Sequence, residues 1–270
     1  YQRNWLEASG SDDSHGRTLW ALGTLLGRSN IPGLQSMAGR LFEEALPAIR
    51  MTTSPRAWAF ALLGIHEYLR RYDGDRRASQ VREELAGRLL ALYQAHRSEQ
   101  WHWFEESLSY CNAALPHAFL MCGQSIPNSA MSDAALESLA WLADLQRDKT
   151  NGGHFVPIGS NGFYKRGGAR ARFDQQPVEA QAMVSACLVA HRITGDKIWY
   201  KEARRAFDWF LGRNDLNLPL YDPTTGGCRD GLHADRPNEN QGAESSLAFL
   251  QAVLELRLAE NTLLTVEAGS

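Results

Sequence analysis

Polar side chains gather at the start of several segments that have the apolar periodicity of helices. These starts read SDDSHGRTLW (11–20), WHWFEESLSYCNAALP (101–116), RFDQQPVEAQA (172–182) and NENQGAESS (238–246). One capping side chain satisfies a helix start, as Ser54 before Pro55 would at TTSPRAW (52–58). The other starts each carry several polar side chains, mostly carboxylates and amides, beside free backbone N–H groups. We interpret the surplus as the lining of a binding or catalytic site.

Spacing decides which of these groups share a face. Asn240 alone would cap its helix, whereas Gln241 and Glu244 are three residues apart and lie on one side. Gln175, Gln176 and Glu179 are arranged in the same way, and Asp12, Asp13 and His15 cluster before Leu19.

The chemistry that fits is acid–base cleavage of a sugar. Trp101, Trp103, Phe104 and Tyr110 surround Glu105 and Glu106, and aromatic rings beside carboxylates suit the apolar faces and hydroxyls of a carbohydrate. Cleaving a glycosidic bond needs two carboxyl groups, about 5–5.5 or about 6.5–9.5 Å apart. The sequence offers more carboxylates than that: Asp12, Asp13, Glu105, Glu106, Asp174, Glu179, Asp230 and Glu244.

Other catalytic motifs do not occur in the sequence. It contains no Gly-x-Ser-x-Gly, no phosphate-binding loop and no His-Glu-x-x-His, so we predict neither a metal nor a cofactor. Three histidines remain candidate acid–base groups: His102, His117 and His154. A histidine near two helix starts would suit a sugar epimerase or isomerase.

Composition narrows the class of protein. The 270 residues are 44% hydrophobic and 22% charged, with a net charge of −3 and no basic stripe for nucleic acid. No apolar run reaches the ~20 residues of a membrane span, and no signal peptide opens the chain. We therefore expect a protein without a membrane or nucleic-acid partner, and a cytoplasmic one unless a signal peptide has been removed. Its four cysteines have no metal-ligand spacing and are predicted to be reduced core residues.

Period-3.6 patterning along almost the whole chain predicts an all-α protein. The expected helices span 14–29, 34–50, 55–73, 76–97, 109–125, 130–148, 176–194, 196–212 and 241–259. Short turns pair them into αα-hairpins in which an apolar helix alternates with a charged one. Inner and outer helices of this kind form a toroid or a solenoid. The long polar links before the inner helices favour a toroid, residues 1–270 forming one domain with these links at one mouth.

Several motifs also resemble a known family. They are WALG (20–23), Tyr110-x-Asn112-x-x-Leu115-Pro116, WFLGRN (209–214), YDPTTGGCRDGL (221–232) and NQGAES (240–245). Together they resemble the six-hairpin glycosidase superfamily, and more closely the bacterial toroid domains found beside or fused to glycosyltransferases. The resemblance implies an (α/α)6 toroid, a carbohydrate in its central pocket and a glycosyltransferase domain as a partner. Four hairpins and one unpaired helix fall short of six, so we expect helices upstream. SDDSHGRTLWALG matches the family's first helix only in part.

The sequence thus predicts a glycoside hydrolase that acts on an oligo- or polysaccharide. The candidate catalytic residues are Glu179, Glu244, Asp13, Glu105 and Glu106. The candidate substrate-binding residues are Asp12, His15, Arg17, Trp101, Trp103, Tyr110, Asn112, Asp174, Gln175, Gln176, Asp230, Asn240 and Gln241. A non-catalytic module that binds a glycan or docks on a glycosyltransferase is one alternative, and a sugar epimerase or isomerase is another.

Overall fold

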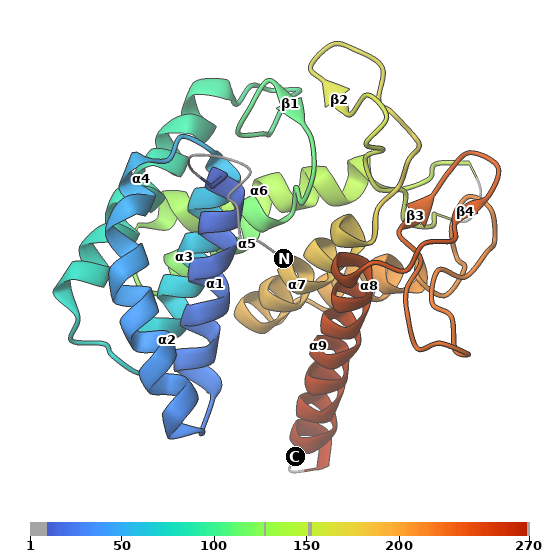
Figure 1. The fold of residues 1–270 in the computed structure, drawn as a ribbon. Helices are drawn as coiled ribbons and strands as arrows, with labels where there is room; N and C mark the ends of the chain where they lie inside the picture. Colours follow the sequence, from blue (N-terminus) through green and yellow to red (C-terminus); the bar gives the residue numbers. More distant parts are fainter. Residues whose placement is uncertain (1–9, 127, 151–152, 269–270) are drawn as a thin grey trace, which may run out of the picture. The chain divides into compact units, whose positions relative to one another are not determined.

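A computed structural model describes residues 10–126, 128–150 and 153–268, and nearly all its regular structure is helical (Figure 1). The helices are α1 (Asp12–Arg28), α2 (Pro32–Ala45), α3 (Pro55–Leu69), α4 (Arg76–His96), α5 (Ala114–Gly123), α6 (Ser129–Leu145), α7 (Pro177–Thr194), α8 (Lys197–Asp208) and α9 (Ala243–Ala268), with a 3₁₀ helix η1 (Leu46–Met51) after α2. Four two-residue strands are β1 (Ser107–Leu108), β2 (Tyr164–Lys165), β3 (Gly231–Leu232) and β4 (Pro237–Asn238). Each helix predicted from the sequence is present.

α9 ends at Ala268, nine residues beyond the predicted 259, and α5 begins at Ala114 and not at 109. The late start of α5 has a local cause. Cys111 adopts φ 49°, a left-handed conformation that a helix excludes. The Asn112 side chain also accepts from the Ser109 N–H at 3.0 Å and donates to the Ser109 carbonyl at 2.9 Å. This local side-chain bonding competes with helix formation and delays the first turn.

The chain divides into two compact units, which are described separately. The first comprises Tyr1–Leu92 with Met121–Ser132, and the second comprises Tyr93–Leu120 with Asp133–Ser270.

In the first unit, α1 and α3 run parallel and pack along a seam of glycines. A Cβ on Gly16 would lie 2.6 Å from the carbonyl oxygen of Ala57, and a Cβ on Gly23 would lie 2.0 Å from that of Gly64. Both positions advance by seven residues, which fixes the parallel direction. The glycines of WALGTLLG therefore admit a neighbouring backbone, and Figure 1 shows α1 beside α3. α3 is buried along most of its length, whereas α1 buries only the face that carries Gly16, Leu19, Gly23 and Leu26.

The starts of α1 and α3 are joined by one carboxylate. Asp12 Oδ2 accepts from the backbone N–H groups of Thr53 at 2.8 Å and Ser54 at 3.1 Å. These two hydrogen bonds lower the pKa of Asp12. The Asp12 carboxylate is therefore bound to the backbone just before α3. The N-cap of α3 is Ser54, as predicted.

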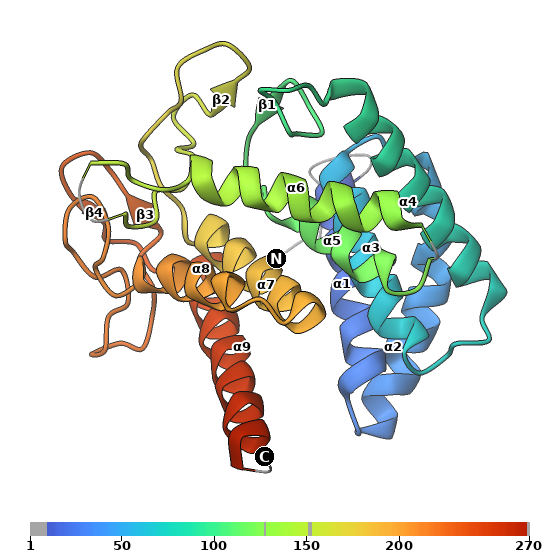
Figure 2. The same ribbon diagram turned by 180° about the vertical axis from the view of Figure 1, so that it is seen from behind.

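In the second unit, short strands join the long links that precede the inner helices. β1 pairs antiparallel with β2, and β3 with β4. A further bridge links Gln175, just before α7, to Leu232 in β3. Figure 2 shows α7, α8 and α9 together with the loops that carry β3 and β4.

Glu137 of α6 makes part of the second unit sensitive to acid. It accepts from Arg97 at 2.7 and 2.8 Å and from the Tyr93 hydroxyl at 2.6 Å, and it lies 2.8 Å from His102 Nδ1. The Arg97 hydrogen bonds, with those from Tyr93 and His102, lower the pKa of Glu137 to about 2. Its contribution to stability is therefore complete above its ordinary pKa of 4.5 and is lost as the pH falls through about 2.

We expect Glu137→Gln to lower the free energy of unfolding at about pH 6 and to have little effect at about pH 2. Urea unfolding of both proteins at several pH values measures this convergence. A stability difference that stays constant down to about pH 2 would contradict the role assigned to the carboxylate.

All four cysteines are buried free thiols, as predicted, and burial raises the pKa of Cys122 to about 12. Within the described ranges, no helix combines the length and the apolar character needed to cross a membrane.

Candidate functional site

The starts of three inner helices meet at one end of the second unit. Asn112, just before α5, bonds to Glu179 in the first turn of α7. The segment before α7 pairs with β3, and the loop that follows β4 leads into α9. The polar links of this unit therefore converge at one end of it.

Glu179 lies at the base of this convergence. Its side chain is buried and accepts from the Asn112 N–H at 3.2 Å, from Asn112 Nδ2 at 2.9 Å and from Gln146 Nε2 at 3.3 Å. These bonds tie the starts of α5 and α7 to the end of α6. Glu179 and Asn112, predicted as catalytic and sugar-binding residues, thus have a structural role in this arrangement.

Asp230 organises the start of α9. Its Oδ1 accepts from the Gly242 N–H at 2.7 Å, and its Oδ2 accepts from Asn240 Nδ2. Burial raises the pKa of Asp230, but the hydrogen bonds from Asn240, Ser245 and Gly242 bring it below its ordinary value. A Cβ on Gly242 would lie 2.9 Å from Asp230 Oδ1, so this glycine makes room for the carboxylate.

Gln241 is held in the same loop. Its Nε2 donates to Asp222 Oδ2 at 3.1 Å, and its Oε1 accepts from the Thr225 hydroxyl at 2.6 Å. A Cβ on Gly227 would lie 2.1 Å from Gln241 Oε1. The Gly-Gly-Cys-x-Asp-Gly-Leu and Asn-Gln-Gly-Ala-Glu-Ser motifs are thus two halves of one folded loop. Of the polar residues in the NQGAES motif, Asn240 and Glu244 are exposed, and Asn240 bonds to Asp230.

Asp174 and His233 form a pair beside the Gln175–Leu232 bridge. Gln175 and Leu232 exchange both backbone hydrogen bonds at 2.9 Å, which brings the residues next to them face to face. His233 Nδ1 lies 2.5 Å from Asp174 Oδ1, and the side chains are 32% and 40% exposed. Because a carboxylate only accepts, Nδ1 carries the proton and Nε2 stays available for proton transfer.

His233 was missed by sequence reasoning. It follows the Asp-Gly-Leu motif directly, but the sequence does not show that β3 pairs with the segment before α7. Asp174 was expected to bind substrate, and its histidine partner gives it an acid–base environment. The neighbouring Gln176 makes no capping hydrogen bond through its side chain, which leaves its amide for a ligand.

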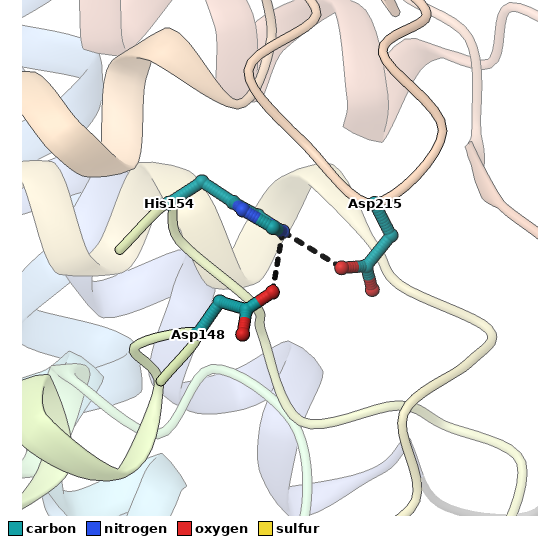
Figure 3. A group of neighbouring side chains, drawn as sticks. All are labelled: Asp148, His154 and Asp215. Atoms are coloured by element: carbon teal, nitrogen blue, oxygen red, sulfur yellow. Dashed lines mark hydrogen bonds and ion pairs between the residues drawn. The ribbon is translucent and has the colours of Figure 1, made fainter. Parts of the chain in front are cut away.

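A second cluster contains Asp148, His154 and Asp215 (Figure 3). Asp148 and His154 come from the link between α6 and α7, and Asp215 comes from the link after α8, with His154 Nε2 at 2.7 Å from Asp215 Oδ1 and 3.5 Å from Asp148 Oδ2. One oxygen or nitrogen from each residue lies within 4.8 Å of the others, a spacing that would suit a metal ion.

The carboxylate oxygens of this cluster already have partners. Arg172 donates to Asp215 at 2.6 and 3.0 Å and to Asp148 at 3.2 Å. Thr150 donates twice to Asp148 Oδ1 at 2.8 Å, and these bonds hold the pKa of Asp148 well below its usual range. The guanidinium supplies the positive charge that a metal would bring, so we interpret the cluster as an ion-pair network.

This network anchors the segment that carries Asp174. Gln175 Nε2 donates to Asp215 Oδ2 at 2.7 Å, and Gln175 Oε1 accepts from Trp209 Nε1 at 2.7 Å. Gln175 is fully buried. It therefore positions its neighbours Asp174 and Gln176, and its amide is not exposed to a substrate as the sequence prediction required.

The aromatic residues before α5 belong mainly to the core. Trp101 is 3% exposed and packs against Trp141 and Tyr164, while Trp103 is fully buried against Trp141 and Phe104. The sugar-stacking role predicted for the two indoles does not fit these positions, because neither ring is exposed. The sequence pattern could not distinguish a core tryptophan from a sugar platform.

Tyr110 and the two glutamates of this link are more accessible. Tyr110 and Glu105 are half-buried, and Glu106 is exposed. Glu106 lies 3.4 Å from Arg166, and its carbonyl accepts from the Arg166 N–H at 2.9 Å, next to the β1–β2 pair.

The remaining candidates lie on α1 in the first unit. Arg17 Nε donates to Asp13 at 2.7 Å, and the Arg17 guanidinium lies 4.3 Å from the centre of the Phe60 ring. His15 Nε2 lies 3.0 Å from the carbonyl oxygen of Ala45. With Asp12 bound to the start of α3, these four residues make contacts that support the first unit.

Comparison with known proteins identifies the fold. The sequence matches no family model, and no curated protein is significantly similar to it. Among solved structures, an unsaturated glucuronyl hydrolase specific for heparin superposes with a TM-score of 0.62 at 16% identity over 90% of this chain and 67% of its own. The α-1,6-mannanase GH76A from Salegentibacter sp. HEL1_6 superposes with a TM-score of 0.63 at 12% identity, over 94% of this chain and 78% of the mannanase. A D-mannose isomerase superposes with a TM-score of 0.64 at 13% identity, over 94% of this chain and 72% of the isomerase.

These similarities establish the fold class. The protein is all-α and has the (α/α)6-toroid fold of these solved structures, as the sequence predicted.

Proposed function

We propose that this protein acts on a carbohydrate and hydrolyses a glycosidic bond. The observation that carries the proposal is the half-exposed Asp174–His233 pair where the polar links of the second unit converge. The fold supports the substrate class, since proteins of this fold include a glucuronyl hydrolase and a mannanase. Because folds host several activities, the argument for hydrolysis rests on the site.

Hydrolysis needs one carboxyl group to protonate the leaving oxygen and a second to act as base or nucleophile. We assign these roles to Asp174 and Glu244. Both are accessible, and both lie at the start of an inner helix of the second unit. His233 orients Asp174, and the Gln176 amide is suited to bind a sugar hydroxyl. Glu179 and Asp230 fit less well, because their oxygens accept the hydrogen bonds that hold the helix starts together.

We expect Asp174→Asn to lower hydrolysis at least about 100-fold, the lower end of what a positioned acid–base group contributes. Release of reducing ends from mannan, cello-oligosaccharides and unsaturated uronides would measure this. Asp235→Asn is the matched control, since Asp235 is 71% exposed and pairs with its neighbour Arg236. The control should retain activity within about twofold. Wild-type rates in Asp174→Asn would contradict the assignment.

Sugar isomerisation or epimerisation is the second candidate, and the orientation of His233 favours it. With Nδ1 bound to Asp174, Nε2 could remove the proton from the carbon next to the carbonyl of an open-chain aldose. The same fold occurs in a D-mannose isomerase and a sugar epimerase. Exchange of the C2 proton of mannose in D2O, followed by NMR and abolished by His233→Gln, would favour this reaction. If the C2 proton does not exchange, the protein does not isomerise or epimerise mannose through this histidine.

A non-catalytic role has its own expected result. Saturable glycan binding without hydrolysis or proton exchange would favour a binding module, including one that works beside a glycosyltransferase domain.

A further inference from the structure

A cavity of about 310 Å³ lies beside α8 in the second unit and is rich in positive charge. Its wall carries five cationic side chains and one carboxylate: Arg147, Lys201, Arg204, Arg205, Arg213 and Asp208. His154 and Tyr200 complete its polar surface. The cavity does not include Asp174 or His233, so it is separate from the site proposed for catalysis.

The charge follows from the sequence of α8. Lys201, Arg204, Arg205 and Asp208 are spaced i, i+3, i+4 and i+7, which places them on one helix face. A charged face of this kind is ordinarily solvated. Here Arg147, just after α6, and Arg213, just after α8, bring further guanidinium groups to the same cavity.

Two of these cations are held in place by a buried acid. Glu202, whose side chain is 6% exposed, accepts from both Arg147 and Arg205. Arg205 also donates to the carbonyl oxygens of Gln146 and Ala143 at 2.9 Å. The walls of the cavity are therefore preorganised before any ligand binds.

The carboxylates do not balance the cations. Asp208 lies 3.0 Å from Arg213 and 3.8 Å from Arg204, and Glu260 lies 3.3 Å from Arg204. With Glu202, these three carboxylates pair with four of the five cations, and Lys201 has no ion-pair partner among the described residues. Asp148 and Asp215, beside the lining residue His154, pair with Arg172. The surplus positive charge gathers in a concave surface, where the attraction for an anion is stronger than on a flat one.

We propose that this cavity binds an oxyanion carried by a small molecule, such as a phosphate ester or the carboxylate of an acidic sugar. Guanidinium groups match both anions through paired N–H donors. A volume of about 310 Å³ is at the lower end for a small-molecule site, enough for one sugar or phosphate group.

The test removes charge without disturbing the buried ion pairs. Lys201 is exposed and Arg213 is 72% exposed, so a Lys201→Gln/Arg213→Gln protein keeps Glu202 and its two arginines. The matched control is Lys165→Gln/Arg236→Gln, which removes two exposed cations of the same unit outside the cavity. Isothermal titration calorimetry would be performed with inorganic phosphate, glucose 6-phosphate, glucuronate and neutral glucose.

We expect one oxyanion to bind per chain and to bind more weakly as salt rises. The cavity variant should bind it about tenfold more weakly, the effect of losing about 1.4 kcal/mol of charge-assisted bonding. The control variant should match the wild type. Binding of the phosphates but not glucuronate identifies a phosphate site, and the reverse identifies an acidic sugar.

The proposal is overturned if none of the three anions binds at about 10 mM, if both variants lose affinity equally, or if glucose binds as tightly as the anions. These measurements do not depend on turnover. The failure of this site and the failure of the proposed hydrolysis would therefore be distinguished.

Discussion

Gly23→Ala is expected to destabilise the first unit by about 3 kcal/mol or more, at or above the usual upper end for overpacking. The new methyl carbon would lie 2.0 Å from the carbonyl oxygen and 2.5 Å from the carbonyl carbon of Gly64. Both atoms belong to the backbone of α3, so no side chain can rotate away. The helices would have to separate, which would loosen the packing around Leu19 and Leu26.

Gly87→Ala is the matched control for this substitution. Gly87 lies within α4, is exposed, and has no atom within 4 Å of an added Cβ. Alanine should therefore stabilise the helix by up to about 1 kcal/mol. Urea unfolding of the two variants would give opposite shifts in midpoint. A Gly23→Ala protein as stable as the wild type would show that α1 and α3 are not in contact through glycine.

Glu179→Ala is expected to lower the free energy of unfolding by about 3–5 kcal/mol, comparable with removing one partner of a buried charged group. The substitution would leave the two N–H donors of Asn112 and the Gln146 amide without their acceptor in a buried position. The starts of α5 and α7 and the end of α6 would lose their common attachment. We expect this loss of stability to appear as a lower midpoint of urea unfolding and a lower Tm.

Glu244→Ala separates the structural role from the catalytic one. It removes the same side chain from the first turn of α9, but Glu244 is exposed. Only a favourable interaction with the helix dipole would be lost, so stability should stay within about 1 kcal/mol of the wild type. Under the proposed function, Glu244→Ala loses activity and keeps its fold. A Glu179→Ala protein that is fully stable but inactive would contradict the structural role and indicate that Glu179 is a catalytic residue.

Much of the helical architecture could be predicted because it depends on local pattern. Apolar residues at helical spacing, the Ser54-Pro55 start and the turn at Thr194-Gly195-Asp196 act over a few residues each. The contrast between AWAFALLGIHEYL and RRASQVREELAGRLL also separated the buried helix α3 from the charged helix α4, whereas WALGTLLG, predicted to be apolar and buried, is buried only on one face of α1. The start of α5 was misplaced because it depends on a left-handed Cys111 and on the hydrogen bonds of Asn112.

The sequence by itself determined the all-α hairpin fold and the concentration of polar groups at the inner-helix starts of this protein. It could not rank those groups, because the same carboxylate can cap a helix, pair with an arginine or face a substrate. Only the tertiary structure decided that Asp230 caps α9, that Glu179 joins three elements, and that His233 meets Asp174 across the Gln175–Leu232 bridge. The physical reason is distance along the chain. The partners in these three contacts are 12, 67 and 59 residues apart, and no local preference encodes such pairs.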